Sequence, residues 1–204
     1  MTPRQYRSRA RAEATEQTHL RITAAAAEVL RERGAGGFSL ESVAKAAGVT
    51  RLTVYNQFGS RRALLEAVFD DRAANGGLHR LRDAMADPDP FAALRRLVEI
   101  FCAFWNFDQA SLASLHAATS GDAEFEASLR QRNERRREAI SVLVGRFAAR
   151  GAIDPSAGRD LTDLLFVMTS FQTYAELDAN RTPEAACTLI WRAVEHAVRG
   201  ASAE

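Results

Sequence analysis

A single glycine, Gly48, separates two short stretches whose apolar residues recur at helical spacing. Ser39 is placed to cap the first stretch, and Thr50 is placed to cap the second. Glycine favours the positive φ at which a helix commonly ends, so the chain can turn sharply between the two stretches. The inward positions are Leu40, Val43, Ala44 and Ala47 in the first stretch, and Val54 and Phe58 in the second. This pattern predicts a helix-turn-helix.

The second stretch carries residue types that prefer strands. We expect a helix to tolerate them there because their side chains face outward. If Val54 and Phe58 point inward, the neighbouring side chains face outward, where contact chemistry matters more than helix propensity. Arg51 can bond guanine edges, and Asn56 can read adenine. Thr53 offers a methyl group to thymine, and Tyr55 can reach phosphate. The residues predicted to contact DNA are Ser39, Thr50, Arg51, Leu52, Thr53, Tyr55, Asn56 and Arg61.

The next helix begins with two cations in an unfavourable place. Ser60 is a suitable N-cap, yet Arg61 and Arg62 occupy the first turn, where the helix dipole disfavours positive charge. Free backbone N–H groups, a hydroxyl and two guanidinium groups together predict a phosphate clamp. The alternative is a pair of solvated surface arginines.

Charge is distributed unevenly along the chain. Residues 1–62 hold eleven Arg or Lys against five Glu, a net charge of +6, so the remainder carries −5. This asymmetry is typical of a polyanion-binding head on a separate body, although it is also compatible with a solubility effect. We therefore expect a DNA-binding domain over residues 1–62, with a basic N-terminal arm holding Arg4, Arg7, Arg9 and Arg11, and a second domain over residues 63–204.

The stretch "FSLESVAKAAGVTRLTVYNQFGSRRALLEAV", within residues 22–68, resembles the DNA-binding head of the tetracycline-repressor (TetR) family of bacterial regulators. The resemblance includes the aromatic Tyr55, the step from Phe58 to Ser60, the basic Arg61 and the Leu64–Leu65 pair. Arg stands at position 61 where the family usually has Lys, which keeps the charge. The resemblance implies an all-α homodimer that binds a pseudo-palindromic operator and releases it when a small molecule enters the C-terminal domain.

The remaining chain continues as helices, so the expected fold is all-α with about nine helices: a three-helix head and a larger helical body for ligand binding and dimerisation. One apolar face of the first helix is expected to hold Leu20, Ile22, Ala26, Val29 and Leu30. Later helices are expected from Arg61 into the seventies with a break or kink at residues 75–77, and over residues 90–107, 109–118, 123–151, 155–177 and 183–197. The arginine-rich run at residues 130–137 is interpreted as a solvated face with Glu134 and Glu138 pairs.

The last two helices have more apolar surface than one chain needs for its core. A symmetry-related copy can cover the surplus in a four-helix interface. The predicted interface residues are Leu164, Met168, Ala186, Leu189, Ile190, Ala193 and Ala197.

Bulky apolar residues with a few polar ones in the body are typical of a small-molecule pocket, although aromatic residues at helical spacing are more often core. The candidates are Phe101, Phe104, Trp105, His116, Phe166, Thr169, Phe171 and Tyr174. His116 on an apolar face is also typical of a structural histidine. The expected function is a ligand-responsive repressor, and the alternative is a DNA-binding dimer whose body serves only assembly or protein contacts.

Several classes of protein are disfavoured. We expect no enzyme, since no nucleophile elbow, phosphate-binding glycine loop or pair of catalytic acids is found. Cys102 and Cys187 have no metal-ligand spacing and are interpreted as buried free thiols, and the histidines are scattered, so neither a metal nor another cofactor is expected. No apolar run is long enough to span a bilayer, and a cytoplasmic protein is expected.

Overall fold

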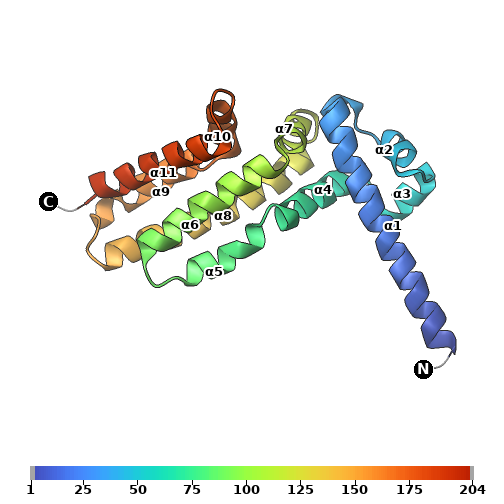
Figure 1. The fold of residues 1–204 in the computed structure, drawn as a ribbon, viewed down its shortest axis with the longest axis horizontal. Coiled ribbons are helices and arrows are strands. Elements are labelled where there is room, and N and C mark those ends of the chain that lie inside the picture. Colours follow the sequence, from blue (N-terminus) through green and yellow to red (C-terminus); the bar gives the residue numbers. More distant parts are fainter. Residues whose placement is uncertain (1–2, 203–204) are drawn as a thin grey trace. The chain divides into compact units, whose positions relative to one another are not determined.

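The computed structural model describes the backbone of residues 3–202 and the side chains of residues 12–202. All regular secondary structure in this part of the chain is helical, with eleven α-helices and four short 3₁₀ turns, which confirms the all-α fold (Figure 1). The chain forms two compact units. Unit 1 comprises Met1–Asp71 and Ala110–Ala127, and unit 2 comprises Arg72–Gln109 and Ser128–Glu204. The predicted functional division between residues 62 and 63 stays a prediction.

Unit 1 is built on three helices at the start of the chain. They are α1 (Pro3–Arg33), α2 (Leu40–Ala47) and α3 (Arg51–Phe58). Helix α1 packs against α2, and α2 packs against α3. The buried residues include Ile22, Ala26, Val29 and Leu30 of α1, and Val43, Ala44 and Ala47 of α2. The expectation for Leu20 was wrong, because its side chain lies on the solvent side of α1 and is 57% exposed.

A segment far along the chain completes unit 1. Helix α7 (Gln109–Ala117) is tied to α1 by two serine hydroxyls. Ser111 Oγ donates to the carbonyl of Ala27 at 3.0 Å, and Ser114 Oγ donates to the carbonyl of Leu30 at 2.9 Å. Both bonds reach carbonyls near the end of α1, so α7 is held against the C-terminal turns of α1.

Unit 2 contains the longer, more apolar helices. They are α5 (Leu81–Ala86), α6 (Pro90–Phe107), most of α8 (Ala123–Ala149), α9 (Gly158–Met168), α10 (Phe171–Asp178) and α11 (Pro183–Gly200). The Asp89 carboxylate accepts from the Phe91 and Ala92 N–H groups, and Pro90 occupies the first position of α6, as its sequence predicts. Helix α6 contacts α5, α10 and α11, and α9 contacts α11. Within the described residues, no helix is long and apolar enough to cross a membrane.

Two breaks explain why there are eleven helices instead of about nine. The helix expected from Arg61 ends as α4 (Arg61–Asn75), and α5 follows a short 3₁₀ turn. Gly76 is needed there, because a Cβ would lie 2.7 Å from both the Arg72 carbonyl oxygen and the Phe104 ring. The helix expected over residues 155–177 is interrupted at Ser170, whose hydroxyl accepts from the Thr173 N–H at 3.2 Å and so starts α10.

Candidate nucleic-acid interface

The turn between α2 and α3 is as tight as its sequence predicts. Gly48 adopts the left-handed conformation, with φ 64° and ψ 37°, and the Val49 N–H donates to the Ala44 carbonyl at 3.0 Å. Ser39 caps α2 by accepting from the Ser42 N–H at 3.0 Å, and Thr50 caps α3 by accepting from the Thr53 N–H at 3.1 Å. Both helices are therefore fixed at their N-terminal ends by short hydroxyl side chains.

Helix α3 presents most of its surface to solvent. Only Val54 is fully buried, while Leu52 is 65% exposed and Tyr55 is 55% exposed. Arg51 and Asn56 are also exposed, and Thr53 is half-buried. The Phe58 ring is half-buried and stacks on His19 of α1, with the ring centroids 4.4 Å apart. The exposed face thus holds cationic, amide, phenolic and apolar groups on one rigid helix.

The two arginines that begin α4 are both engaged within unit 1. Arg61 Nε donates to the Phe38 carbonyl at 3.1 Å, and its Nη2 donates to the Ala35 carbonyl at 3.3 Å. The same guanidinium lies 5.6 Å from the centroid of the Phe38 ring. Arg62 forms an ion pair with Glu124. Ser60 caps the helix as expected, accepting from the Ala63 N–H at 3.0 Å.

This arrangement gives Arg61 a structural task that sequence reasoning missed. Its bonds hold the loop before α2 against the start of α4, and a phosphate contact by Arg61 stays a prediction. The carbonyl acceptors leave no signal in the sequence, since they belong to backbone. The four arginines of the basic N-terminal arm lie outside the part of the chain whose side chains are described.

The aromatic residues proposed for a ligand pocket mostly form a packed cluster in unit 2. The ring centroids of Phe104 and Trp105 are 4.6 Å apart, and those of Trp105 and Phe171 are 5.5 Å apart. Trp105 Nε1 donates to the Thr169 carbonyl at 3.0 Å. The buried members are Phe101, Phe104, Trp105, Thr169, Phe171 and Tyr174. Phe166 is half-buried, and His116 belongs to α7 of unit 1, where its Nδ1 lies 2.8 Å from the Leu112 carbonyl.

A buried cation beside this cluster corrects the interpretation of residues 130–137 as a wholly solvated face. Arg136 is only 5% exposed, and its Nη1 donates at 2.7 Å to both the Phe166 carbonyl and Thr169 Oγ1. Its guanidinium lies 4.2 Å from the Phe166 ring centroid, and no partner is found for its Nε among the described residues. Burial lowers the pKa of Arg136 to about 10. Arg137, one residue along, does pair with Glu134 and Asp163.

The predicted dimer residues divide into two groups. Ala186 and Ile190 are buried within the single chain, so they have almost no surface left for a partner. Leu164 is 45% exposed and Leu189 is 36% exposed, whereas Met168, Ala193 and Ala197 are half-buried. Sequence reasoning missed Val167 of α9, which is 60% exposed.

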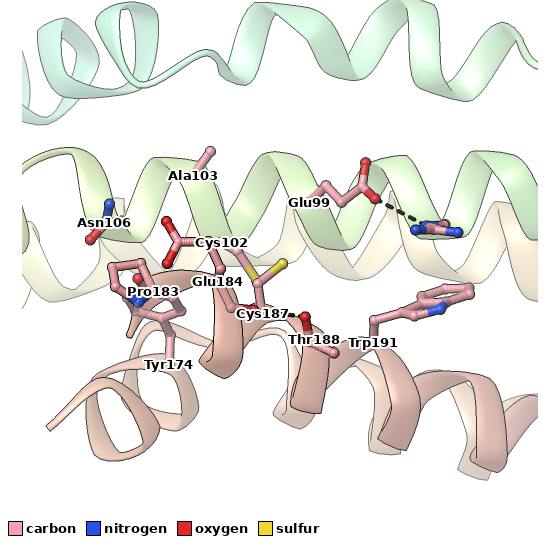
Figure 2. A pocket seen from close by; sticks show the side chains of 11 residues that line it. Glu99, Cys102, Ala103, Asn106, Tyr174, Pro183, Glu184, Cys187, Thr188 and Trp191 are labelled. Carbon is pink, nitrogen blue, oxygen red and sulfur yellow. Dashed lines mark hydrogen bonds and ion pairs between the residues drawn. The ribbon is translucent and has the colours of Figure 1, made fainter. Parts of the chain in front are cut away.

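A groove of about 440 Å³ lies between α6, α10 and α11 (Figure 2). Arg95, Glu99 and Trp191 line one part of it, and Arg95 Nε bonds Glu99 Oε1 at 3.0 Å. Cys102, Cys187 and Tyr174 line another part, and Tyr174 is the one proposed pocket residue in this lining. Among the described side chains, no group of three or more His, Cys, Asp or Glu is placed to hold a metal ion.

The architecture of unit 1 defines a class. A capped helix pair with a tight glycine turn, whose second helix presents polar side chains to solvent, is a helix-turn-helix DNA-binding module. Residues 22–68 match the family model described as bacterial regulatory proteins of the tetR family. The match assigns residues 22–68 to the DNA-binding domain of TetR-family transcriptional regulators, which are transcription factors rather than enzymes.

Solved structures share the fold across both units. A TetR transcription regulator from Haloarcula marismortui is 16% identical, with a TM-score of 0.74, covering 91% of this chain and 98% of that one. A transcriptional regulator from Rhodococcus sp. Rha1 is 18% identical, with a TM-score of 0.71 and coverages of 91% and 98%. NalD of Pseudomonas aeruginosa, the secondary repressor of the MexAB-OprM multidrug efflux pump, is 22% identical, with a TM-score of 0.67 and coverages of 91% and 97%. No curated protein sequence matches the chain.

Proposed function

We propose that this protein is a repressor that binds an inverted-repeat operator as a homodimer in the cytoplasm and leaves it when a small molecule binds the body. The exposed face of α3 carries this proposal, because Arg51, Tyr55 and Asn56 are free of the core on a capped helix. Such a helix can enter the major groove, where Arg and Asn distinguish base edges. The name of NalD as a repressor supports the direction of regulation.

The experiment for the operator is to sequence genomic DNA fragments captured by the purified protein. A dimer that places two α3 helices in successive major grooves, about 34–36 Å apart, should recover an inverted repeat with that half-site spacing. Fragments that share only base composition, with no paired half-sites, would contradict the proposal.

The dimer proposal rests on apolar side chains that the single chain leaves exposed. Leu164 and Val167 of α9 and Leu189 of α11 lie on two helices in contact with each other. Exposed apolar side chains on two packed helices suit a four-helix interface with a second copy. Leu189→Arg should dissociate the dimer by placing an unpaired charge in the interface, as measured by light scattering. Val142→Arg is the control, since this exposed valine lies on α8. A monomer mass for the unchanged protein would contradict the proposal.

The effector proposal requires coupling between two sites. To weaken operator binding a hundredfold, a small molecule must favour the DNA-free state by about 2.7 kcal/mol. By linkage, saturating operator must weaken binding of that molecule by the same factor. The measurement is ligand affinity with and without operator, for any apolar or aromatic molecule found by screening.

Close packing of the aromatic cluster favours the second candidate, a DNA-binding dimer without an effector. A ligand among Phe104, Trp105 and Phe171 must displace rings that already contact one another. A thermal-shift screen of varied small molecules separates the candidates, because a ligand at 100 times its dissociation constant adds about 2.7 kcal/mol of stability. A screen without stabilising molecules supports the effector-free dimer.

A further inference from the structure

The two cysteines, 85 positions apart in the sequence, meet in the groove between α6 and α11. Figure 2 shows their sulfur atoms next to each other, with Cys102 on α6 and Cys187 on α11. The two side chains lie close enough to share a hydrogen bond. Neither belongs to a disulfide. Adjacent thiols on two packed helices are the starting geometry for a reversible cross-link.

The environment gives the two thiols different roles. The hydrogen bond with Cys102 lowers the pKa of Cys187, and the Arg95 guanidinium adds to this effect, although burial and the Glu99 carboxylate act in the opposite direction. The same hydrogen bond, together with burial, raises the pKa of Cys102 well above its usual range. Cys187 is half-buried in a groove that opens to solvent, whereas Cys102 is only 6% exposed. Cys187 is therefore the thiol that a small oxidant reaches first.

We propose that Cys102 and Cys187 form a peroxide-sensitive redox pair, in which Cys187 reacts first and Cys102 closes a disulfide between α6 and α11. The Cys187 thiolate attacks a hydroperoxide and the O–O bond breaks, so the sulfur becomes a sulfenic acid and the leaving alkoxide or hydroxide takes a proton from solvent to depart as alcohol or water. The Cys102 sulfur then attacks the Cys187 sulfur, the S–O bond breaks, and hydroxide leaves with the Cys102 proton as water. Two thiols are oxidised and one hydroperoxide is reduced, and a small dithiol restores the pair by exchange.

The two thiols stay accessible when the proposed dimer face is covered. Residues two apart on an α-helix point about 200° apart, so Cys187 and the exposed Leu189 lie on nearly opposite sides of α11. Glu184, Thr188 and Trp191 line the groove beside Cys187. The thiols therefore stay open to solvent through the groove when a second copy covers Leu189.

The experiment treats the reduced full-length protein with hydrogen peroxide and maps its peptides without reduction. We expect one cross-link within a single chain, joining the Cys102 and Cys187 peptides, which a dithiol reverses. Cys187→Ser should slow peroxide consumption by roughly tenfold or more. Cys102→Ser should still be oxidised at Cys187, but it should form no cross-link and should leave a sulfenic acid at Cys187 that a 1,3-diketone reagent traps.

Cys102→Ala provides a second variant in case a serine hydroxyl is poorly tolerated at the buried position, and circular dichroism checks that each variant is folded. Thiols that both stay reduced, cross-links only between chains, or first oxidation at Cys102 would each overturn the proposal.

A consequence for DNA binding rests on the proposed function. Because α11 carries the proposed dimer face, a covalent link to α6 should change operator affinity by about fivefold or more, and not in Cys102→Ala. Unchanged affinity with a formed disulfide would overturn this regulatory role and leave the redox pair standing. Failure of the reduced protein to bind any operator would instead overturn the proposed function.

Discussion

Helix α3 of unit 1 and the aromatic cluster of unit 2 were predicted from the same kind of signal, but the side chains of α3 are mostly exposed and those of the cluster are mostly buried. Both were recognised by unusual side chains at helical spacing. In α3, Tyr55 and Leu52 lie at the surface, and only Val54 is fully buried. In unit 2, Phe104, Trp105 and Phe171 pack ring against ring.

This difference shows when helical spacing predicts whether a side chain is exposed, buried in a core or facing a cavity. For an eight-residue helix with one buried position, the outward face follows once the inward residue is known. For α6, residues on more than one side are buried, so spacing does not tell whether a given side chain meets another helix or an empty cavity. Substitutions test this contrast: those in the aromatic cluster should change the free energy of unfolding, and those on the exposed face of α3 should change DNA affinity.

The largest effect is expected for Trp105→Ala. Removing a core ring that packs at a tilt against Phe104 and donates to the Thr169 carbonyl should lower the free energy of unfolding by about 3–5 kcal/mol. Tyr55→Ala, the matched aromatic on α3, should change it by less than about 0.5 kcal/mol while weakening DNA binding. Chemical denaturation measures both variants. A loss below about 1 kcal/mol for Trp105→Ala would indicate that the ring lies in a cavity instead of a core.

Next in size is Arg51→Ala on the exposed face of α3. Loss of a bidentate base contact should cost about 1–3 kcal/mol on the operator and relax base choice at one position. Arg82→Ala removes the same charge from an exposed site on α5 and should leave operator binding unchanged. Binding is measured by fluorescence anisotropy on operator and random duplexes. Equal losses on both duplexes would assign Arg51 to the phosphate backbone.

Arg61→Ala tests the structural task of the α4 N-terminus. Loss of two charge-assisted bonds to the Phe38 and Ala35 carbonyls should destabilise the protein by about 1–2 kcal/mol. Arg62→Ala, which removes only an ion pair with exposed Glu124, should cost under about 1 kcal/mol. If Arg61 also binds phosphate, its replacement lowers the salt slope of DNA binding by about one. Equal stability of the two variants would contradict the structural role.

The smallest effect is expected for Arg136→Met. The guanidinium is buried, and the cost of removing its charge from water lowers its pKa. An apolar side chain of similar length should therefore leave the protein equally stable or more stable by about 1 kcal/mol. Thermal denaturation measures the change. A large loss would show that the bonds to Phe166 and Thr169 outweigh the cost of burying the charge.

Local chemistry made much of the fold predictable. Ser39, Thr50, Asp89 and Ser60 act as the helix caps that their residue types and positions predict, and Gly48 has the positive φ that its place requires. The break after Asn75 was also expected, since the signal is a pair of glycines. Each of these features depends on residues within a few positions of one another, so the sequence shows all the partners.

By itself, the sequence determined an all-α chain with a helix-turn-helix near its start, a family relationship and an outward face for α3. Only the tertiary structure decided which apolar faces were already covered, as for Ile190, and which were open, as for Val167. It also joined Arg61 to the loop before α2 and brought Cys102 beside Cys187. The physical reason is range: caps and turns are formed by neighbours in the chain, whereas burial, a carbonyl acceptor and a thiol partner are supplied by segments tens of residues away.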